Sequence, residues 1–382
     1  PTSDTMMKGS GKAALVVCAA IFVARHGVWV AWASLVATGL WDPCFFRNER
    51  VAWAMGKAAP RLSATPVGPE PVAELANYSY EALRVASENW KEPVVVRGLF
   101  RSDAAEPILA ALRGFEISVI QNSTLGKDHD FTCGVVSAAS VDSRMENFSE
   151  AIADIKAYDP RVLGRPRKTM VVPPASRSDR KKDPNLDAAV VRAVDRYVDL
   201  GGVVGGPWAD KGVAYSTITQ LFVGAGDDAG TQGTGWHADI CNNFFVQLAG
   251  EKTWRFVPPA QSLHMRPSMK RGKTAIAAAD YSVKAIEDYL PHKKEVTLRP
   301  GDFLYNPDWY WHRITNAPGF AVGVVARECR ILTRSFPAHP VFTAMIVLNH
   351  LVAAVAGNDK YARARLLAAF GIGASTMVHD GD

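Results

Sequence analysis

The pattern of hydrophobic and polar positions changes near the middle of the chain, from helical spacing to short strand-like runs. Residues 71–88, 148–157 and 187–200 carry apolar side chains at helical spacing, and each range predicts a helix. Residues 93–98 read Pro-Val-Val-Val-Arg-Gly, an apolar run closed by a glycine, which predicts a short buried strand. Three helices and one short strand are therefore expected before residue 214.

Beyond residue 214, short runs rich in β-branched and aromatic residues are separated by Gly, Pro, Asn and Asp, which predicts strands joined by turns. Many short strands without alternating helices are typical of an antiparallel sandwich or barrel. The expected fold class is mainly β with flanking helices. The strands are expected at residues 214–223, 243–248, 253–257, 295–298, 302–305 and 320–326.

The first 41 residues have a different pattern from the rest of the chain. Lys8 and Lys12 precede two apolar runs, residues 13–23 and 28–41, which are separated by Arg25-His26-Gly27. Basic residues followed by an apolar stretch and small residues are the layout of a secretory signal peptide. If residues 13–41 cross a bilayer as one helix, Arg25 lies near the centre of the membrane, and its insertion costs about 2.5–3.5 kcal/mol.

Residues 1–41 are therefore interpreted as a signal peptide or signal anchor, with an organellar targeting segment or a buried helix as alternatives. Under the first interpretation we expect a secretory or organellar location and a membrane tether at the N-terminus. If the segment is not a targeting signal, a cytoplasmic location is expected.

The remaining chain divides into a linker, one large domain and a C-terminal extension. Proline-rich residues 42–70 predict a linker, and residues 71–335 are expected to form one domain. Within it, residues 161–183 hold eight Lys and Arg residues, interpreted as a solvated insertion or as a docking surface for an acidic partner. Residues 336–382 predict a helical hairpin that forms a homodimer interface or packs on the barrel.

Composition narrows the class of protein without pointing to a function. The 382 residues are 48% hydrophobic and 21% charged, which excludes a mainly disordered or collagen-like chain. A net charge of +5 is mild for this length, so no specific nucleic-acid binding is expected. The five cysteines have no C-x-x-C spacing and predict neither a zinc site nor a disulfide framework, although a pairing of Cys44 with Cys133 stays open.

Candidate metal ligands lie in the strand-rich half. His237 and Asp239 are two positions apart, so on an extended segment both side chains point to the same face. His312 follows a glycine turn, a predicted strand and a second turn. Two histidines and one carboxylate form a face that leaves adjacent coordination positions open, as in non-haem Fe(II) oxygenases. Zn(II) with a closed ligand set is the alternative metal.

A lysine close to these ligands adds to the pattern. Residues 243–254 predict a strand, a tight turn at Gly250 and a returning strand that begins near Lys252. A lysine that faces into a barrel is costly unless it meets an anion. The alternative is a lysine that points outward into solvent.

With these residues the sequence resembles a known family, the jumonji C and cupin-like 2-oxoglutarate oxygenases, especially the branch that contains factor inhibiting HIF. The resemblance covers about residues 90–330 and is carried by residues 93–99, 234–259 and 300–312. In the middle block a threonine stands three before the first ligand, an asparagine six after it and a lysine fifteen after it.

The resemblance implies a double-stranded β-helix, a jelly-roll or cupin barrel, with helices packed outside, and it implies Fe(II), 2-oxoglutarate and O2 as cofactors. His237, Asp239 and His312 resemble the catalytic iron ligands. The positions that resemble the cosubstrate site are Lys252 as the partner of the distal carboxylate, Thr234 as a hydroxyl donor to it, Asn243 as a polar wall, and Tyr215 or Tyr305 as the assisting tyrosine.

The sequence also departs from the family pattern at two places. Factor inhibiting HIF, an asparaginyl hydroxylase, has an asparagine on the last barrel strand. In this sequence the corresponding residues 320–325 offer only apolar or small side chains. Cys241 stands two positions after Asp239 and is interpreted as a small packing residue, with substrate contact or sensitivity to oxidation as alternatives.

The resemblance implies hydroxylation of a C–H bond with release of succinate and CO2. A protein side chain is the first substrate class expected, and a small molecule is the second. A non-catalytic, metal-binding cupin-like protein is the alternative from another class. Lys252 separates these readings, because a barrel without turnover has no need of a buried partner for an anion.

Overall fold

A computed structural model of the chain describes residues 61–121, 142–159, 168–172, 185–200, 203, 218–226, 233–262, 264–265, 268–269, 275–277, 286–328, 334–339 and 343. The predicted targeting segment, residues 1–41, lies outside the described residues, and so does most of the predicted linker. Among the described residues, no helix has both the length and the apolar composition needed to cross a membrane.

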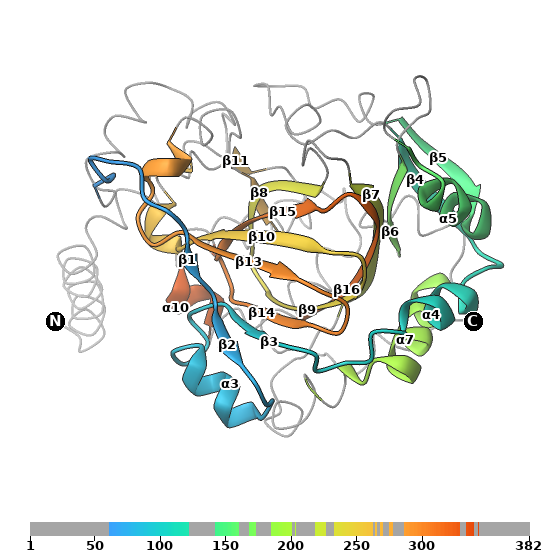
Figure 1. Ribbon diagram of the computed structural model, residues 1–382, viewed down its shortest axis with the longest axis horizontal. Helices are drawn as coiled ribbons and strands as arrows, with labels where there is room; N and C mark the ends of the chain where they lie inside the picture. Colours follow the sequence, from blue (N-terminus) through green and yellow to red (C-terminus); the bar gives the residue numbers. More distant parts are fainter. Residues whose placement is uncertain are drawn as a thin grey trace, which may run out of the picture.

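Two β-sheets make up the centre of the molecule (Figure 1). The seven-stranded sheet has the order β1 (Glu70–Pro71), β13 (Lys294–Leu298), β10 (Lys252–Val257), β15 (Trp311–Asn316), β8 (Gly233–Asp239), β12 (Ala275–Ala277) and β11 (Ser268–Met269). The nine-stranded sheet has the order β2 (Ala73–Leu75), β3 (Val94–Val96), β14 (Phe303–Asn306), β9 (Asn242–Ala249), β16 (Gly319–Glu328), β7 (Ile218–Gly226), β6 (Lys168–Val172), β4 (Glu116–Gln121) and β5 (Asp142–Asn147).

An inner core joins the two sheets. Trp254 and Phe256 of β10 pack in one cluster with Phe245 of β9, Leu304 of β14 and Val325 of β16. Side chains on a strand point alternately to the two faces, so the neighbours of Phe245 on β9 face outward into a second core. Strand β9 therefore reads as a nearly continuous apolar run, because both of its faces are buried.

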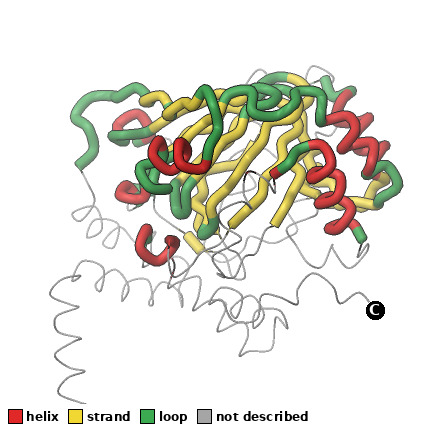
Figure 2. Tube along the Cα trace, turned by 90° about the horizontal axis from the view of Figure 1, so that it is seen from below, coloured by secondary structure: helices red, strands yellow, loops and turns green. Residues whose placement is uncertain are grey.

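The second core lies between the nine-stranded sheet and the helices that cover its outer face (Figures 1 and 2). These helices are α4 (Ala105–Ala111), α5 (Phe148–Lys156) and α7 (Leu186–Tyr197). Helix α5 begins where the Asn147 side chain accepts a hydrogen bond from the Ser149 N–H, and its apolar face is buried. The shorter helices are α3 (Tyr80–Ala86), α10 (Phe336–Ala338) and the 3-10 turns η3 (Pro259–Gln261) and η4 (Glu287–Tyr289).

The mainly β fold class and the cupin or jelly-roll architecture are confirmed. The helices expected at 148–157 and 187–200 are present as α5 and α7, within a residue or a few at their ends. The strands expected at 93–98, 243–248, 253–257, 295–298, 302–305 and 320–326 are present as β3, β9, β10, β13, β14 and β16. Of the strand expected at 214–223, the described part begins at Ile218 and continues to Gly226.

Two predictions for the first half were wrong. Residues 71–88 do not form one helix, because Ala73–Leu75 adds to β3 as β2 and the helix begins only after the Ser79 cap. The interpretation of residues 161–183 as an insertion fails for Lys168–Val172. Its β-branched residues form β6, which pairs with β4 and β7, and Lys168 forms ion pairs with Glu146 and Asp154.

The predicted domain limits stay a prediction. Residues at the end of the predicted linker bond to η4, since Ser63 N–H donates to the Tyr289 carbonyl and Val67 N–H to the Asp288 carbonyl. The predicted C-terminal hairpin lies outside the described residues apart from Phe336–His339 and Thr343.

Candidate metal centre

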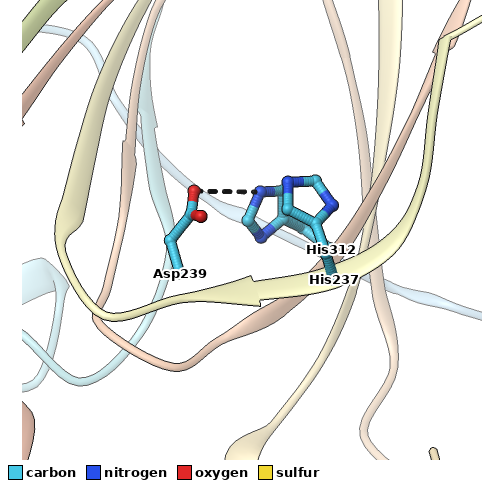
Figure 3. Close-up of side chains that lie close together, drawn as sticks. All are labelled: His237, Asp239 and His312. Carbon is cyan, nitrogen blue, oxygen red and sulfur yellow. Dashed lines mark ion pairs between the residues drawn. The ribbon is translucent and has the colours of Figure 1, made fainter. Parts of the chain in front are cut away.

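Three potential metal ligands meet on the inner face of the seven-stranded sheet. His237 and Asp239 lie on β8, and His312 lies on β15 directly opposite His237 in the antiparallel register. Their donor atoms lie within 4.8 Å of one another, and the two imidazole rings are 4.1 Å apart. Figure 3 shows the Asp239 carboxylate pointing toward both rings. The sequence-predicted set is thus brought together by one strand pair.

Backbone carbonyls fix the orientation of both histidines. Nδ1 of His237 lies 2.8 Å from the Gly235 carbonyl, and Nδ1 of His312 lies 2.9 Å from the Tyr310 carbonyl. A proton on each Nδ1 makes both contacts hydrogen bonds, which leaves the Nε2 lone pairs for a metal ion. Trp254 stacks on the His312 ring with centroids 5.4 Å apart.

The carboxylate of Asp239 is held by polar neighbours on three strands. Its Oδ2 accepts a hydrogen bond from Nδ2 of Asn243 at 3.0 Å, and it lies 3.9 Å from Nε2 of His312 and 3.7 Å from Nε of Arg327. Burial raises the pKa of Asp239, but the positive charge of Arg327 and the hydrogen bond from Asn243 act against burial, so the pKa is lowered and the group is ionised. Burial lowers the pKa of His312 to about 3, so this ring stays neutral.

Residues much later in the chain hold the turn that follows β8. The Trp309 N–H donates to the Asp239 carbonyl at 2.8 Å, with Trp309 itself at φ 61°. The Ser335 hydroxyl contacts both the Ile240 carbonyl and Oδ2 of Asp308 at 2.8 Å. The backbone of the carboxylate ligand is therefore held from outside its own sheet.

A bulge in β8 brings Thr234 to the ligand face. Thr234 pairs with Ile314, and His237 pairs with His312. Between these two pairs, β8 advances by three residues while β15 advances by two, so β8 holds one extra residue, the bulge. Because residues two apart on β15 share a face, Thr234 and His237 share one as well.

Lys252 is a buried lysine, not a solvated one. It begins β10, is 6% exposed, and its Nζ lies 6.0 Å from the centroid of the Phe245 ring in the inner core. Within the described residues, this Nζ has neither a hydrogen bond nor an ion pair. Burial alone lowers the pKa of Lys252 to about 8. The Lys252 ammonium is thus a buried cation, and no counter-charge lies beside it in the described part of the barrel.

Lys252 lies opposite Asn316, four residues along β15 from His312. At about 3.3 Å per residue, the lysine backbone is about 13 Å along the strand from the ligand row. A small ligand with charged groups at both ends could therefore contact the metal ligands and Lys252 together.

Not every predicted residue belongs to this site. Tyr215 lies outside the described residues. Tyr305 faces the outer core, where its hydroxyl donates to the Trp90 carbonyl and to Oδ1 of Asn242, so it does not reach the ligand face. Cys241 is in a disulfide bond, which its interpretation as a small packing residue did not foresee.

Arg327 was not among the predicted site residues. Residues 320–325 of the last strand carry no polar side chain, but β16 continues to Glu328 and Arg327 lies beside Asp239. Alternation along β16 places Arg327 on the face of Val325, and it is the charged residue of that face. This alternation is a sequence signal that could have identified it.

Comparison with known proteins agrees with this architecture. Residues 90–326, more than half of the chain, match the family model described as a cupin-like domain. The chain belongs to the cupin-like domain family. The matched range begins just before β3 and ends within β16, so this cupin-like domain includes all three potential ligands and Lys252.

A curated relative points to oxygen chemistry. The chain is 36% identical over 93 residues to ribosomal oxygenase 2 from Bos taurus. That match spans 24% of this chain and 17% of the bovine protein, so the chain spans well under two thirds of that relative's length.

Proposed function

We propose that this cupin-like protein is an Fe(II)- and 2-oxoglutarate-dependent oxygenase that hydroxylates a C–H bond and releases succinate and CO2. The observation that carries the proposal is Lys252, a buried ammonium without a counter-charge in the described barrel, on the face shared with two histidines and a carboxylate. A non-catalytic barrel gains nothing from such a lysine, whereas a dicarboxylate cosubstrate supplies its missing anion.

The donor set fits Fe(II). Two imidazoles and one carboxylate neutralise one charge of a divalent ion and leave adjacent positions open, and the donor atoms of His237, Asp239 and His312 lie close enough together to form such a set. Among the described residues, no fourth Cys, His, Asp or Glu joins this group, which favours iron over a closed zinc site. Bound there, iron would supply the oxidation of the C–H bond by O2.

The protein side chains would bind and orient the reactants. Lys252 would pair with the distal carboxylate of 2-oxoglutarate, and the Thr234 hydroxyl would donate to the same carboxylate from β8. Asn243 holds the Asp239 carboxylate by its Nδ2, and its buried Oδ1 has no hydrogen-bond partner among the described residues. Tyr215 stays a further candidate for cosubstrate binding.

For the molecule to be hydroxylated, a protein side chain is the first class and a small molecule the second. The name of the similar bovine protein, a ribosomal oxygenase, supports an oxygenase in this chain as well. Because the match covers a small part of that protein, its ribosomal connection is not extended to this chain.

Calorimetry without O2 tests the proposal, with Mn(II) in place of Fe(II). We expect one 2-oxoglutarate to bind per chain, and only when the metal is present. Replacement Lys252→Met should weaken this binding by at least about 30-fold, since loss of one partner of a buried charge pair costs about 2–5 kcal/mol. Lys156→Met is the matched control, because Lys156 is on the surface of α5 and pairs with Glu106.

Absence of 2-oxoglutarate binding to the metal-loaded wild-type protein would overturn the proposal. Equal affinity in the Lys252→Met and wild-type proteins would overturn the role of the lysine alone.

A further inference from the structure

Arg327 lies inside the barrel, beside the candidate metal centre. It is on β16, opposite Asn243 of β9 and Ile218 of β7. Gly323 and Val325 share its face, and both meet the inner core, since a Cβ on Gly323 would contact the Phe245 ring. The side chain of Arg327 therefore projects toward the ligands, as its distance of 3.7 Å from Oδ2 of Asp239 also requires.

Two neighbours and one aromatic ring hold the guanidinium in place. Nε lies 3.7 Å from Oδ2 of Asp239, and Nη1 donates a hydrogen bond to Oε1 of Gln220. Its Cζ lies 5.8 Å from the centroid of the Phe222 ring, so the ring packs on the planar group. Within the described residues, Nη2 has no acceptor, and the side chain is 19% exposed. The guanidinium is therefore held in a fixed orientation, and the side chain that carries it is largely buried.

Within the described residues, the charges that line the site do not balance one another. In the described barrel wall, Asp239 is negative, whereas Lys252 and Arg327 are positive. A divalent ion would add two positive charges and use the Asp239 carboxylate. The two carboxylates of 2-oxoglutarate would then be used at the metal and at Lys252. Arg327 would be left as a desolvated cation, which is costly without a partner.

We propose that Arg327 binds a carboxylate of the molecule to be hydroxylated and so places a neighbouring C–H bond at the metal. This inference rests on the proposed function, and it names the chemical class of the substrate. A carboxylate matches the guanidinium because two parallel N–H donors face two oxygens, a geometry that an ammonium lacks. The carboxylate can belong to an aspartyl or glutamyl side chain or to a small carboxylic acid.

The first test uses acetate as the probe. Protein loaded with Zn(II) and saturated with 2-oxoglutarate is titrated with ¹³C-acetate, and binding is followed by NMR line broadening. We expect saturable binding to the wild-type protein, at least about tenfold weaker binding to Arg327→Gln, and an intermediate loss for Arg327→Lys. Arg255→Gln is the matched control, because Arg255 is an exposed arginine that pairs with Glu295 on the same barrel.

The affinity for 2-oxoglutarate is measured on the same samples and separates the outcomes. Unchanged cosubstrate affinity together with lost acetate binding supports the inference and shows that the variants are folded. Equal acetate binding by wild type and both Arg327 variants overturns it. A matching loss of 2-oxoglutarate affinity overturns it too, because Arg327 would then serve the cosubstrate. Failure of the wild type to bind 2-oxoglutarate overturns the proposed function and this inference together.

A second arm identifies the source of the carboxylate. Short peptides with one central Asp or Glu, the same peptides with Asn or Gln, and a panel of free carboxylic acids are tested for stimulation of succinate formation. We expect one acidic class to stimulate the wild-type protein, with the stimulation lost in Arg327→Gln. Stimulation by the amide peptides to the same extent as by the acidic ones would contradict a carboxylate substrate.

Discussion

A lysine ammonium inside a barrel opposes folding, because it loses its hydration when the barrel closes. The pKa of Lys252 falls from its ordinary value of 10.5 to about 8. Between these values the unfolded chain binds more protons than the folded one, so the free energy of unfolding rises with pH across this window. The full shift corresponds to about 3 kcal/mol that the charged lysine costs below pH 8.

Replacement Lys252→Met should therefore stabilise the ligand-free protein at pH 7 by up to about 3 kcal/mol, with a smaller gain at pH 10. Urea unfolding of both proteins, without metal, measures this at the two pH values. A less stable Lys252→Met protein at pH 7 would show that the lysine already has a partner in the folded chain.

Removal of one imidazole ligand should abolish metal binding. His237→Ala leaves two protein donors, and we expect the affinity for Mn(II) to fall by at least about 100-fold, more than loss of an outer partner costs. Electron paramagnetic resonance of free Mn(II) measures the change. His292→Ala, a substitution at an imidazole that is 73% exposed, is the control and should bind as the wild type does. Equal binding by His237→Ala would place the metal elsewhere.

At the scale of residues, the spacing of His237, Asp239 and His312 indicated a metal site, because an H-x-D pair on a strand is a local signal. The turn before Lys252 left its direction open, and the resemblance to the oxygenase family gave its role. Arg327 could not be found in the same way. Its proximity to Asp239 depends on the pairing of β16 with β9 and β7, and that pairing joins positions that are far apart in the sequence.

Among the elements, the β9–β10 hairpin places Lys252 at the inner end of the barrel. Gly250 closes it at φ +63°, and a Cβ there would lie 2.2 Å from the Phe320 carbonyl oxygen. The Gln247 side chain donates to the Gly250 carbonyl at 3.1 Å and holds the turn.

Gly250→Ala should destabilise the protein by about 2–5 kcal/mol, from left-handed strain and the clash with the carbonyl. Gly98→Ala is the matched control, since Gly98 has φ +58° but open space at its Cβ position, and it should cost about 1–2 kcal/mol. Chemical denaturation measures both. Equal losses would show that the carbonyl can move away without cost.

The C-terminal segment is bound to the end of β8 by Ser335. Replacement Ser335→Ala leaves the Ile240 carbonyl without this donor, and we expect a loss of about 1–3 kcal/mol. Ser149→Ala is the control, because its hydroxyl donates to the Arg113 carbonyl at an exposed position. Urea unfolding compares them, and an equal small effect in both would mean that the contact of Ser335 contributes little.

Elements of the strand-rich half were predictable because hydrophobic alternation and Gly or Pro turns mark each strand. The first strand of the nine-stranded sheet was not predictable. Ala73–Leu75 has no strand pattern of its own, and it is extended because it pairs with β3. Strand β6 was not predicted, because it begins in a basic stretch that indicated a solvated insertion. Its Lys168 can lie in the sheet because it pairs with two acids, one from β5 and one from α5. Such pairings are tertiary effects that local propensity does not report.

For the molecule as a whole, bound ligands should raise the stability of the fold. A ligand present at 100 times its Kd adds about 2.7 kcal/mol, which corresponds to a rise of about 5–10 °C in Tm for a domain of this size. We expect Mn(II) to give one rise and 2-oxoglutarate a second. In Lys252→Met at the same ligand concentrations, the first rise should remain and the second should fall to about a third or less, because a 30-fold weaker affinity leaves about 0.9 kcal/mol. A second rise without metal would contradict the shared site.

The central claim is that the barrel couples a metal ion to 2-oxoglutarate, and Fe(II)-dependent formation of succinate tests it most directly. Purified protein with Fe(II), ascorbate, O2 and 2-oxoglutarate is assayed for succinate by mass spectrometry. The wild type should form succinate even without its substrate, His237→Ala should form none, and Lys252→Met should need far more 2-oxoglutarate. Wild-type protein that binds both ligands and forms no succinate, or His237→Ala protein that matches its rate, would contradict the account.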